Sequence, residues 1–339
     1  VGSEMCIRDR GNSPEYFGGN YDKYYIIDDK GRKWSVVYDS SIKCVDKNGN
    51  SASRNYAVEL VTPVLEYGDI PLLQEVVRAV RKAGGITGAE YRAGIHIHID
   101  GAPYTAQSLR NLVNIFANKE NFLFDMLQVS PMRETYCQKV DRDFLEKLNK
   151  KKPKTIEEIR KLWYRGDMNE VHHHYSSTRY RACNLHSFFA NGHWEMRACN
   201  SSLHAGAIRS YVTLALAISN AALTKKFCSP HISESDNLRY SARVWLINLG
   251  LNGTEFKNCR KHLISHLDGC ISWRHPEDAI AQRERLKQER VAAREQRVEP
   301  VSEVQEQCEN IPDEPEEAVT SDFEEEYEEE ENMGFSMSM

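Results

Sequence analysis

The 339-residue sequence predicts an α+β fold with a substantial hydrophobic core. Three observations support this class. Residues 94–100 alternate apolar and polar side chains with the two-residue period of a strand. Residues 105–127 instead repeat apolar side chains with the 3.6-residue period of an amphipathic helix. The apolar content of 40% is sufficient to fill a core between such elements.

The other strands are expected to be short and to be separated by turns. A short strand at 24–27 is followed by alternating residues at 34–39 and by a strand at 56–62 that Pro63 helps to end. Further along, 180–188 and 193–199 are predicted to pair as a hairpin around the turn Ala190-Asn191-Gly192.

Apolar periodicity places the helices around these strands. The first covers 70–83 and is closed by Gly84-Gly85, since glycine readily adopts the conformation that ends a helix. The remaining helical segments are 105–127, 141–163 with a turn near Pro153, a long apolar helix at 205–223, and two helices within 237–268.

The two ends differ from the rest of the chain. Residues 1–10 have no periodicity and are interpreted as an artefact of a truncated gene end. Residues 276–299 are expected to form a charged, solvated helix. The segment 300–339 is predicted to be disordered, because from Val301 onward it has 15 acidic residues and no Lys or Arg.

Composition narrows the classes of function. Nine scattered cysteines, no C-x-x-C motif and no signal peptide favour a reduced, cytoplasmic compartment and no membrane partner. The sequence also lacks the glycine-rich motifs of P-loop and dinucleotide-binding proteins. Outside the acidic segment the charge is +9, which suits an anionic ligand such as a nucleotide; a nucleic-acid partner is not expected.

The segment Gly94-Ile-His-Ile-His-Ile-Asp100 is the strongest candidate for a functional strand. Its isoleucines share one face, whereas His96, His98 and Asp100 share the other. Two imidazoles at positions i and i+2 can bind one metal ion, but they can equally be ordinary polar residues on a solvated face.

Three further strands carry polar groups that need either a partner or a function. Glu59 lies among apolar residues, Arg179 and Arg181 share one face, and Glu195 shares a face with Arg197. Carboxylates and a histidine can hold a divalent metal, and arginines can bind phosphate oxygens. Ordinary ion pairs on an open antiparallel sheet remain the alternative.

Four motifs resemble the amidoligase family, which belongs to the glutamine synthetase-like carboxylate–amine ligases. They are Glu-Leu-Val-Thr-Pro at 59–63, Gly-Ile-His-Ile-His at 94–98, Arg-Tyr-Arg-Ala-Cys-Asn-Leu at 179–185, and Trp-Glu-Met-Arg at 194–197 followed by Asn200-Ser-Ser-Leu203. The resemblance covers about Trp34 to Leu223. It implies a catalytic domain over 11–275, in which a curved antiparallel sheet flanked by helices cradles the site.

The resemblance also implies a reaction and a set of site residues. ATP and Mg²⁺ would activate a carboxylate of a small molecule or peptide as an acyl phosphate, which an amine then attacks. Glu59, His96 and Glu195 correspond to metal ligands, and His98, Arg197 and Asn200 to nucleotide-binding residues. Catalytic contacts to phosphate or substrate correspond to Arg179, Arg181 and Arg197.

One family feature is missing from the sequence. The family opens with a strand carrying G-x-E-x-E, and residues 11–33 contain no such motif. The first strand and one or two metal ligands are therefore expected to be absent, which puts the activity of this chain in question.

Two other functions remain open on sequence grounds. A metallohydrolase could use His96, His98, Glu195 and one of His172, His173 and His174 as a transition-metal site. Alternatively, an inactive ligase fold could act as a binding protein through its charged helix.

Overall fold

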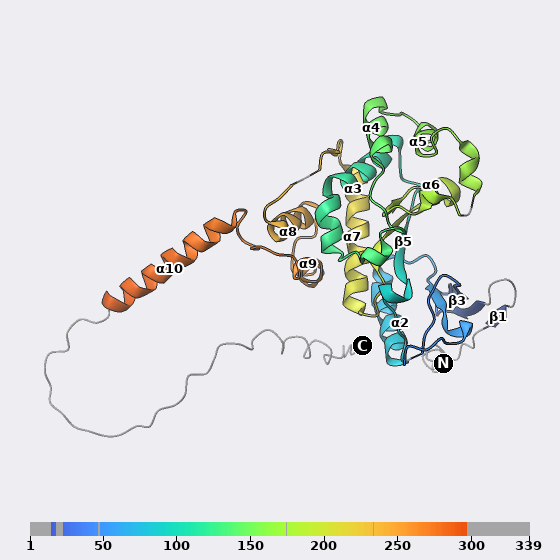
Figure 1. Ribbon diagram of the computed structural model, residues 1–339, viewed down its shortest axis with the longest axis horizontal. Helices are drawn as coiled ribbons and strands as arrows, with labels where there is room; N and C mark the ends of the chain where they lie inside the picture. The colour runs from blue at the N-terminus through green and yellow to red at the C-terminus, as the bar shows by residue number, and fades with distance from the viewer. Residues whose placement is uncertain (1–14, 18–22, 47, 174, 233, 297–339) are drawn as a thin grey trace, which may run out of the picture. The chain divides into compact units, whose positions relative to one another are not determined.

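The computed structural model describes residues 15–17, 23–46, 48–173, 175–232 and 234–296 (Figure 1). The sequence interpretations for 1–10 and 300–339 lie outside these ranges. The chain divides into two units between Glu284 and Arg285. The larger unit contains the strands and the helices α2 to α9, and it confirms the α+β class with two small antiparallel sheets.

The first sheet is a four-stranded antiparallel meander. Its strands, in spatial order, are β1 (Glu15–Phe17), β2 (Lys23–Ile27), β3 (Lys33–Tyr38) and β4 (Val58–Val61). All four residues of β4 are exposed. These exposed side chains are available to a neighbouring site, and β4 lies at the edge of this sheet.

Helix α2 (Ile70–Lys82) anchors the first sheet to the rest of the unit. Its apolar face, with Leu73 and Val77, packs with Trp34 of β3 and Ile208 in a small core. A buried carboxylate, Asp69, reinforces the junction by accepting hydrogen bonds from side chains of the β2–β3 turn. The first sheet is thus fixed to the helices rather than joined to the second sheet.

The second sheet holds the histidine strand in the order β5 (Gly94–Asp100), β7 (His193–Asn200) and β6 (Cys183–Asn184). A bulge interrupts the β5–β7 pairing, because Ile95 pairs with Cys199 whereas Ile97 pairs with Met196. One residue of β5 therefore faces two residues of β7 at this point, which locally bends the strand.

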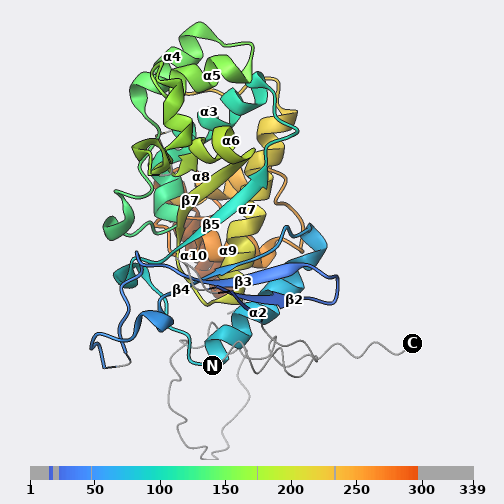
Figure 2. The ribbon, with the colours of Figure 1, turned by 90° about the vertical axis from the view of Figure 1, so that its right-hand side faces the viewer.

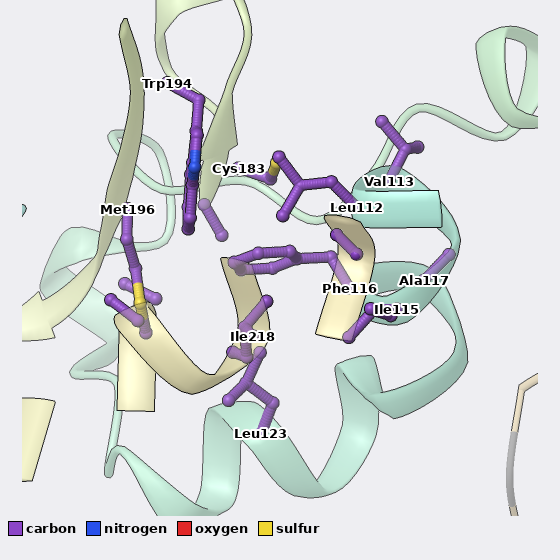
Figure 3. Packing of buried hydrophobic residues seen from close by; sticks show 14 of the residues in the cluster. Leu112, Val113, Ile115, Phe116, Ala117, Leu123, Cys183, Trp194, Met196 and Ile218 are labelled. Atoms are coloured by element: carbon purple, nitrogen blue, oxygen red, sulfur yellow. The ribbon is translucent and has the colours of Figure 1, made fainter. Parts of the chain in front are cut away.

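Two long helices cover the apolar face of the second sheet. They are α3 (Ala106–Met126) and α7 (Ala205–Thr224), and they pack against each other (Figures 1 and 2). Figure 3 shows Trp194 and Met196 of β7 in this core with Phe116 of α3 and Ile218 of α7. The Trp194 and Phe116 rings meet edge to face, with centroids 5.9 Å apart.

Helix α7 is long and apolar enough to cross a membrane by length and composition. In this fold, however, it packs against α2, α3, α9 and β5, and Leu214, Ala215 and Ile218 are fully buried. These contacts explain why α7 is so apolar: it is a helix of the protein core.

Shorter helices surround this core. They are α4 (Arg142–Lys151), α5 (Ile156–Trp163), α6 (His186–Asn191), α8 (Leu238–Asn248) and α9 (Lys257–Ile264). Asp141 and Thr155 cap α4 and α5 with their side chains, which accounts for the break near Pro153. Helix α10 (Pro276–Gln296) follows, and its described side chains are almost all exposed.

Three expectations from the sequence are corrected. The strands form two sheets instead of the one curved sheet that the resemblance implied. The predicted pairing of 180–188 with 193–199 is confirmed only at β6, which pairs antiparallel with β7. The rest of this hairpin is wrong, because β6 has only two residues and α6 occupies the expected turn. Apolar residues at 185, 188 and 189 suit a short helix as well as a strand, so periodicity could not distinguish them. Conversely, β1 adds a strand that the sequence pattern did not predict.

Candidate functional site

Glu195 is the centre of a polar cluster on the face of β7 opposite the apolar core. Its side chain is only 5% exposed. The Asn184 side chain donates a 2.6 Å hydrogen bond to Oε2, and Arg197 Nη1 donates one of 2.7 Å to Oε1. Burial opposes ionisation, yet Arg197 and the other polar neighbours hold the pKa of Glu195 below its usual value. Glu195 is therefore a buried carboxylate that stays ionised.

Arg197 is almost as deeply buried as its partner. Its side chain is 6% exposed, and Nε also donates to the carbonyl of Tyr136. The guanidinium lies over the Tyr180 ring at 5.9 Å. The strand alternation that placed Glu195 and Arg197 on one face is thus confirmed by their direct contact.

The two histidines of β5 approach the same carboxylate. His96 Nδ1 is 3.1 Å from Glu195 Oε1, and His98 Nε2 is 4.0 Å from the same atom. Burial, followed by the charge of Arg197, lowers the pKa of His96 to about 3, and burial also lowers the pKa of His98. Both imidazoles are therefore neutral near pH 7, which is the form that binds metals.

A third histidine, which the sequence analysis did not single out, extends this row. The side chains of His193 and His98 meet diagonally on adjacent strands, with their Nδ1 atoms 2.9 Å apart and their rings edge to face. Its Nδ1 atom is also 3.0 Å from Ser187 Oγ of α6. The alternation of β7 could have identified it, since His193 shares a face with Glu195 and Arg197.

Glu59 comes to this cluster from the first sheet. It lies on the exposed edge strand β4, yet its carboxylate interacts electrostatically with Glu195, Arg197 and Arg179. Desolvation by the surrounding protein, then the charges of Asp39 and Glu195, raise the pKa of Glu59. Two carboxylates from separate sheets thus repel each other in a region that also contains guanidinium groups.

The two other predicted arginines, Arg179 and Arg181, differ in how close they lie to the Glu195 cluster. Arg179 lies at the end of a 3₁₀ turn, close enough to Glu59 to influence its pKa. The expected strand through Arg179 and Arg181 is wrong. Arg181 donates to the Lys139 carbonyl and to Asp141, and neither partner belongs to the Glu195 cluster.

Asn200 is engaged with the backbone of a neighbouring turn. Its side chain donates to the Gln128 carbonyl and accepts from the Ser130 amide. These two bonds fix the end of β7 to the turn after α3. In this arrangement the amide group supports the site framework instead of being directed toward the Glu195 cluster.

Arg133 is a framework residue that sequence reasoning missed. It is buried, and its guanidinium donates to the carbonyls of Arg197, within the β7 bulge, and of Cys199, just after it. It also fills the space over Gly94 where a Cβ atom would otherwise lie. No local motif marks Arg133, because its role depends on a strand more than 60 residues away.

The donor set around Glu195 fits a divalent cation by its chemistry. Ionised Glu195, neutral His96 and the carboxylate of Glu59 are suitable ligand types, and a cation would relieve the repulsion between the two carboxylates. In the described part of the chain, no three His, Cys, Asp or Glu side chains already form a compact metal cluster. Binding of a cation would therefore require these side chains to move closer together. It would also require Glu195 to contact both the cation and Arg197.

The cysteines and tryptophans near the site are packing residues. Trp34 and Trp194 are buried, as are Cys183 and Cys199. Burial raises the pKa of Cys183 well above its usual value and that of Cys199 to about 12, so neither is a ready nucleophile.

Comparison with known proteins adds one match. The family model described as "Putative amidoligase enzyme" matches residues 5–219, which is more than half of the chain and includes every predicted site residue. No curated protein matches the chain, and no solved structure matches it.

Proposed function

Because the chain belongs to the family described as putative amidoligase enzyme, we propose that it is an ATP- and Mg²⁺-dependent carboxylate–amine ligase that forms an amide or peptide bond. The observation that carries this proposal is the convergence on Glu195: Arg197 and His96 contact it directly, and Glu59 interacts with it from the other sheet. A glutamine synthetase-like arrangement, with the two sheets forming two walls of one site, is part of the proposal.

We assign the metal-binding role to Glu59, Glu195 and His96. Magnesium prefers oxygen ligands, so the carboxylates would be its main protein ligands and the imidazole a minor one. When bound, Mg²⁺ would neutralise charge on the phosphate oxygens of ATP. His98 lies farther from Glu195 and is better suited to contact the nucleotide.

We assign the phosphate-binding role to Arg197 and Arg179. Phosphoryl transfer spreads negative charge over the oxygens of the transferred group, and positioned guanidinium groups stabilise that charge. Arg197 is already oriented by Glu195 and Tyr136, so it would lose little freedom on binding. Arg181 and Asn200 would support the site through the backbone that they hold.

The proposed reaction has two steps. A carboxylate oxygen of the substrate attacks the γ-phosphorus of ATP, so that ADP leaves and an acyl phosphate forms. The nitrogen of the amine then attacks the acyl carbon, inorganic phosphate leaves, and the nitrogen loses a proton. The substrates would be small molecules or peptides, and we place the reaction in the cytoplasm, with neither a membrane nor a nucleic acid taking part.

A metallohydrolase is the second candidate, supported by the pair His96 and His98. Its proposed third histidine ligand lacks support among the described residues, because His172 is exposed and His173 contacts Glu170 instead of the Glu195 cluster. Stoichiometric zinc or iron that survives chelation during purification would favour this candidate over the ligase.

A binding protein without catalysis is the third candidate. It retains the same fold and requires no metal or nucleotide chemistry at Glu195. Binding of Mg²⁺-ATP by equilibrium dialysis, followed by turnover, would exclude this candidate.

Hydroxylamine trapping tests the ligase proposal directly. The full chain would be incubated with Mg²⁺-ATP, hydroxylamine and a panel of amino acids and dipeptides, because hydroxylamine converts an acyl phosphate into a hydroxamate that ferric iron colours. We expect hydroxamate and ADP in equal amounts for at least one carboxylate. ADP release that is indifferent to every carboxylate, or no binding of Mg²⁺-ATP, would overturn the proposal.

Glu195→Gln provides the matched variant, with Glu146→Gln, at an exposed position of α4, as its control. Loss of the site carboxylate should reduce hydroxamate formation by about 100-fold or more, since it removes a proposed Mg²⁺ ligand and the group that orients Arg197 toward the phosphate. Glu146→Gln should behave as the unaltered chain does. Equal activity of the two variants would remove Glu195 from the catalytic site.

A further inference from the structure

Four of the five basic residues in helix α10 lie in one stripe along its surface. Arg283, Lys287, Arg290 and Arg294 are separated by four, three and four residues, and all four are exposed. At 3.6 residues per turn, these positions fall within an arc of about 60°. We call these four residues the basic stripe.

The rest of the helix surface is arranged around this stripe. Exposed aliphatic side chains flank it, with Ile280 and Val291 on one side and Leu286 on the other. The acidic residues Glu277, Asp278 and Glu289 project from the other half of the helix, and Glu284 lies at the boundary, about 90° from the centre of the stripe. The face thus combines concentrated positive charge with exposed apolar surface.

The separation of basic from acidic residues on α10 differs from the pattern of a helix that is stabilised only by solvated ion pairs. Such helices alternate acidic and basic residues so that i,i+4 pairs form around the whole surface. The ion pair described on α10, Arg285 with Glu289, lies away from the basic stripe. The stripe also has charges where a coiled coil would need apolar residues, so a second copy of α10 is a poor partner.

We propose that the basic stripe of α10 binds the chain's own segment 323–331, Phe-Glu-Glu-Glu-Tyr-Glu-Glu-Glu-Glu. Seven glutamates among residues 324–331 supply the opposite charge. Phe323 and Tyr327 supply aromatic surface for the flanking Ile280, Leu286 and Val291. The occupant therefore matches both properties of the face, charge and apolar surface.

The length of the intervening chain permits this contact. Phe323 is 27 residues beyond the end of α10 at Gln296. That many residues can span up to about 90 Å when extended, whereas the 21-residue helix is about 32 Å long. The tethered segment would also have a high effective concentration, so that weak individual ion pairs could still sum to an occupied surface.

Occupation would mask the most concentrated basic face of α10. Nucleic acids would then have to displace 323–331 before reaching the stripe, and their binding would be suppressed. An exposed aliphatic row would be covered at the same time, which limits nonspecific association.

Carbodiimide crosslinking of the full chain tests the contact, because it joins a lysine amine to a carboxylate only when the two touch. Lys287 is the single lysine in residues 276–339. Mass spectrometry is expected to show Lys287 joined to a glutamate of 324–331, with the product lost in 0.5 M NaCl, where screening shortens the range of charge to about 4 Å. Absence of this product would overturn the proposal.

Arg290→Glu and Arg285→Glu form a matched pair for this test. Both reverse one charge near Lys287, but only Arg290 belongs to the stripe. Arg290→Glu should lower the yield of the Lys287 crosslink by about threefold or more, because it replaces an attractive exposed ion pair with a repulsive one. Arg285→Glu should leave this yield unchanged. An equal effect of the two variants would contradict the stripe model.

Two further outcomes would assign the surface to another occupant. When ¹⁵N-labelled and unlabelled chains are mixed, each crosslinked product should contain peptides that are either both labelled or both unlabelled. Products that join a labelled peptide to an unlabelled one would mean that a second copy supplies the segment. If crosslinks are absent and random duplex DNA binds the full chain in a manner that Arg290→Glu weakens, the stripe is a nucleic-acid site and the proposal is wrong.

Discussion

The guanidinium of Arg133 lies over Gly94 so closely that a Cβ atom at residue 94 would overlap it. From this place Arg133 donates to the carbonyls of Cys199 and Arg197 and so ties β7 to the start of β5. The glycine of the Gly-x-His-x-His motif is thereby explained by packing. The same contact sets the backbone position of Arg197, which binds Glu195.

Gly94→Ala should destabilise the fold by about 2–3 kcal/mol, because the methyl group forces a buried, hydrogen-bonded guanidinium to move. Urea unfolding measures the change. Gly68→Ala is the control, since a Cβ atom there meets nothing within 4 Å. In an Arg133→Met background the cost of Gly94→Ala should shrink, and an unchanged cost would show that the two residues act independently.

The Asp69 junction should contribute more to stability than a surface ion pair. Asp69 is buried and accepts hydrogen bonds from Lys30 Nζ (2.7 Å), Arg32 Nη1 (2.5 Å) and the Glu66 amide (2.9 Å). Asp69→Asn is expected to cost about 2 kcal/mol in urea unfolding. Asp143→Asn should cost less than about 0.5 kcal/mol, because its pair with Lys147 is half exposed. Equal costs would refute the structural role of Asp69.

Ionised Asp69 should also make the stability of the fold decrease in acid. The hydrogen bonds from Arg32 and Lys30 hold the pKa of Asp69 far below its usual value. A lowered carboxyl pKa contributes stability that is fully present above about pH 4 and is lost as the pH falls toward the folded-state pKa. Asp69→Asn should therefore flatten the acid side of the stability curve, and a parallel curve for the variant would contradict this assignment.

Local periodicity predicted most of the elements that position the site. The strands around 34–39 and 94–100, together with the helices near 70–83 and 105–127, follow directly from alternation or from the 3.6-residue pattern. Alternation also predicted that Glu195 and Arg197 share a face, and the structure pairs them. These successes share one cause, since each depends only on residues close together in the sequence.

The features that escaped prediction depend on distant contacts. The bulge opposite His96 arises from the pairing of β5 with β7 and cannot be seen in either strand alone. Arg133 acquires its role only after β7 lies beside it. Similarly, short apolar runs such as 185–189 fit a helix or a strand equally well, and tertiary packing made the choice.

His96 should make stability depend on pH near neutrality. Its pKa in the folded chain is about 3, chiefly because of burial, whereas an unfolded histidine titrates near 6.5. Between these values the unfolded state binds more protons, so stability should fall as the pH decreases below about 6.5. His96→Gln should lose less stability between pH 7 and pH 5 than the unaltered chain, as measured by urea unfolding.

His231→Gln is the control for this measurement, because His231 is exposed and lies outside the site. It should leave the pH dependence of stability unchanged. If His96→Gln and His231→Gln give the same curve as the unaltered chain, the imidazole of His96 is hydrated in solution rather than desolvated against Glu195.

Magnesium binding should couple to the protonation of Glu59. Desolvation and the neighbouring carboxylates Asp39 and Glu195 raise the pKa of Glu59, and a bound cation would oppose this shift by stabilising the ionised form. At pH 6, MgCl₂ at ten times its dissociation constant should raise the unfolding free energy by about 1.4 kcal/mol, which corresponds to a rise in Tm of about 2–4 °C. Glu59→Gln should lose most of this rise, whereas Glu146→Gln, at an exposed position of α4, should keep it. A full magnesium response in Glu59→Gln would remove the first sheet from the metal site and leave Glu195 and His96 as its only supported protein ligands.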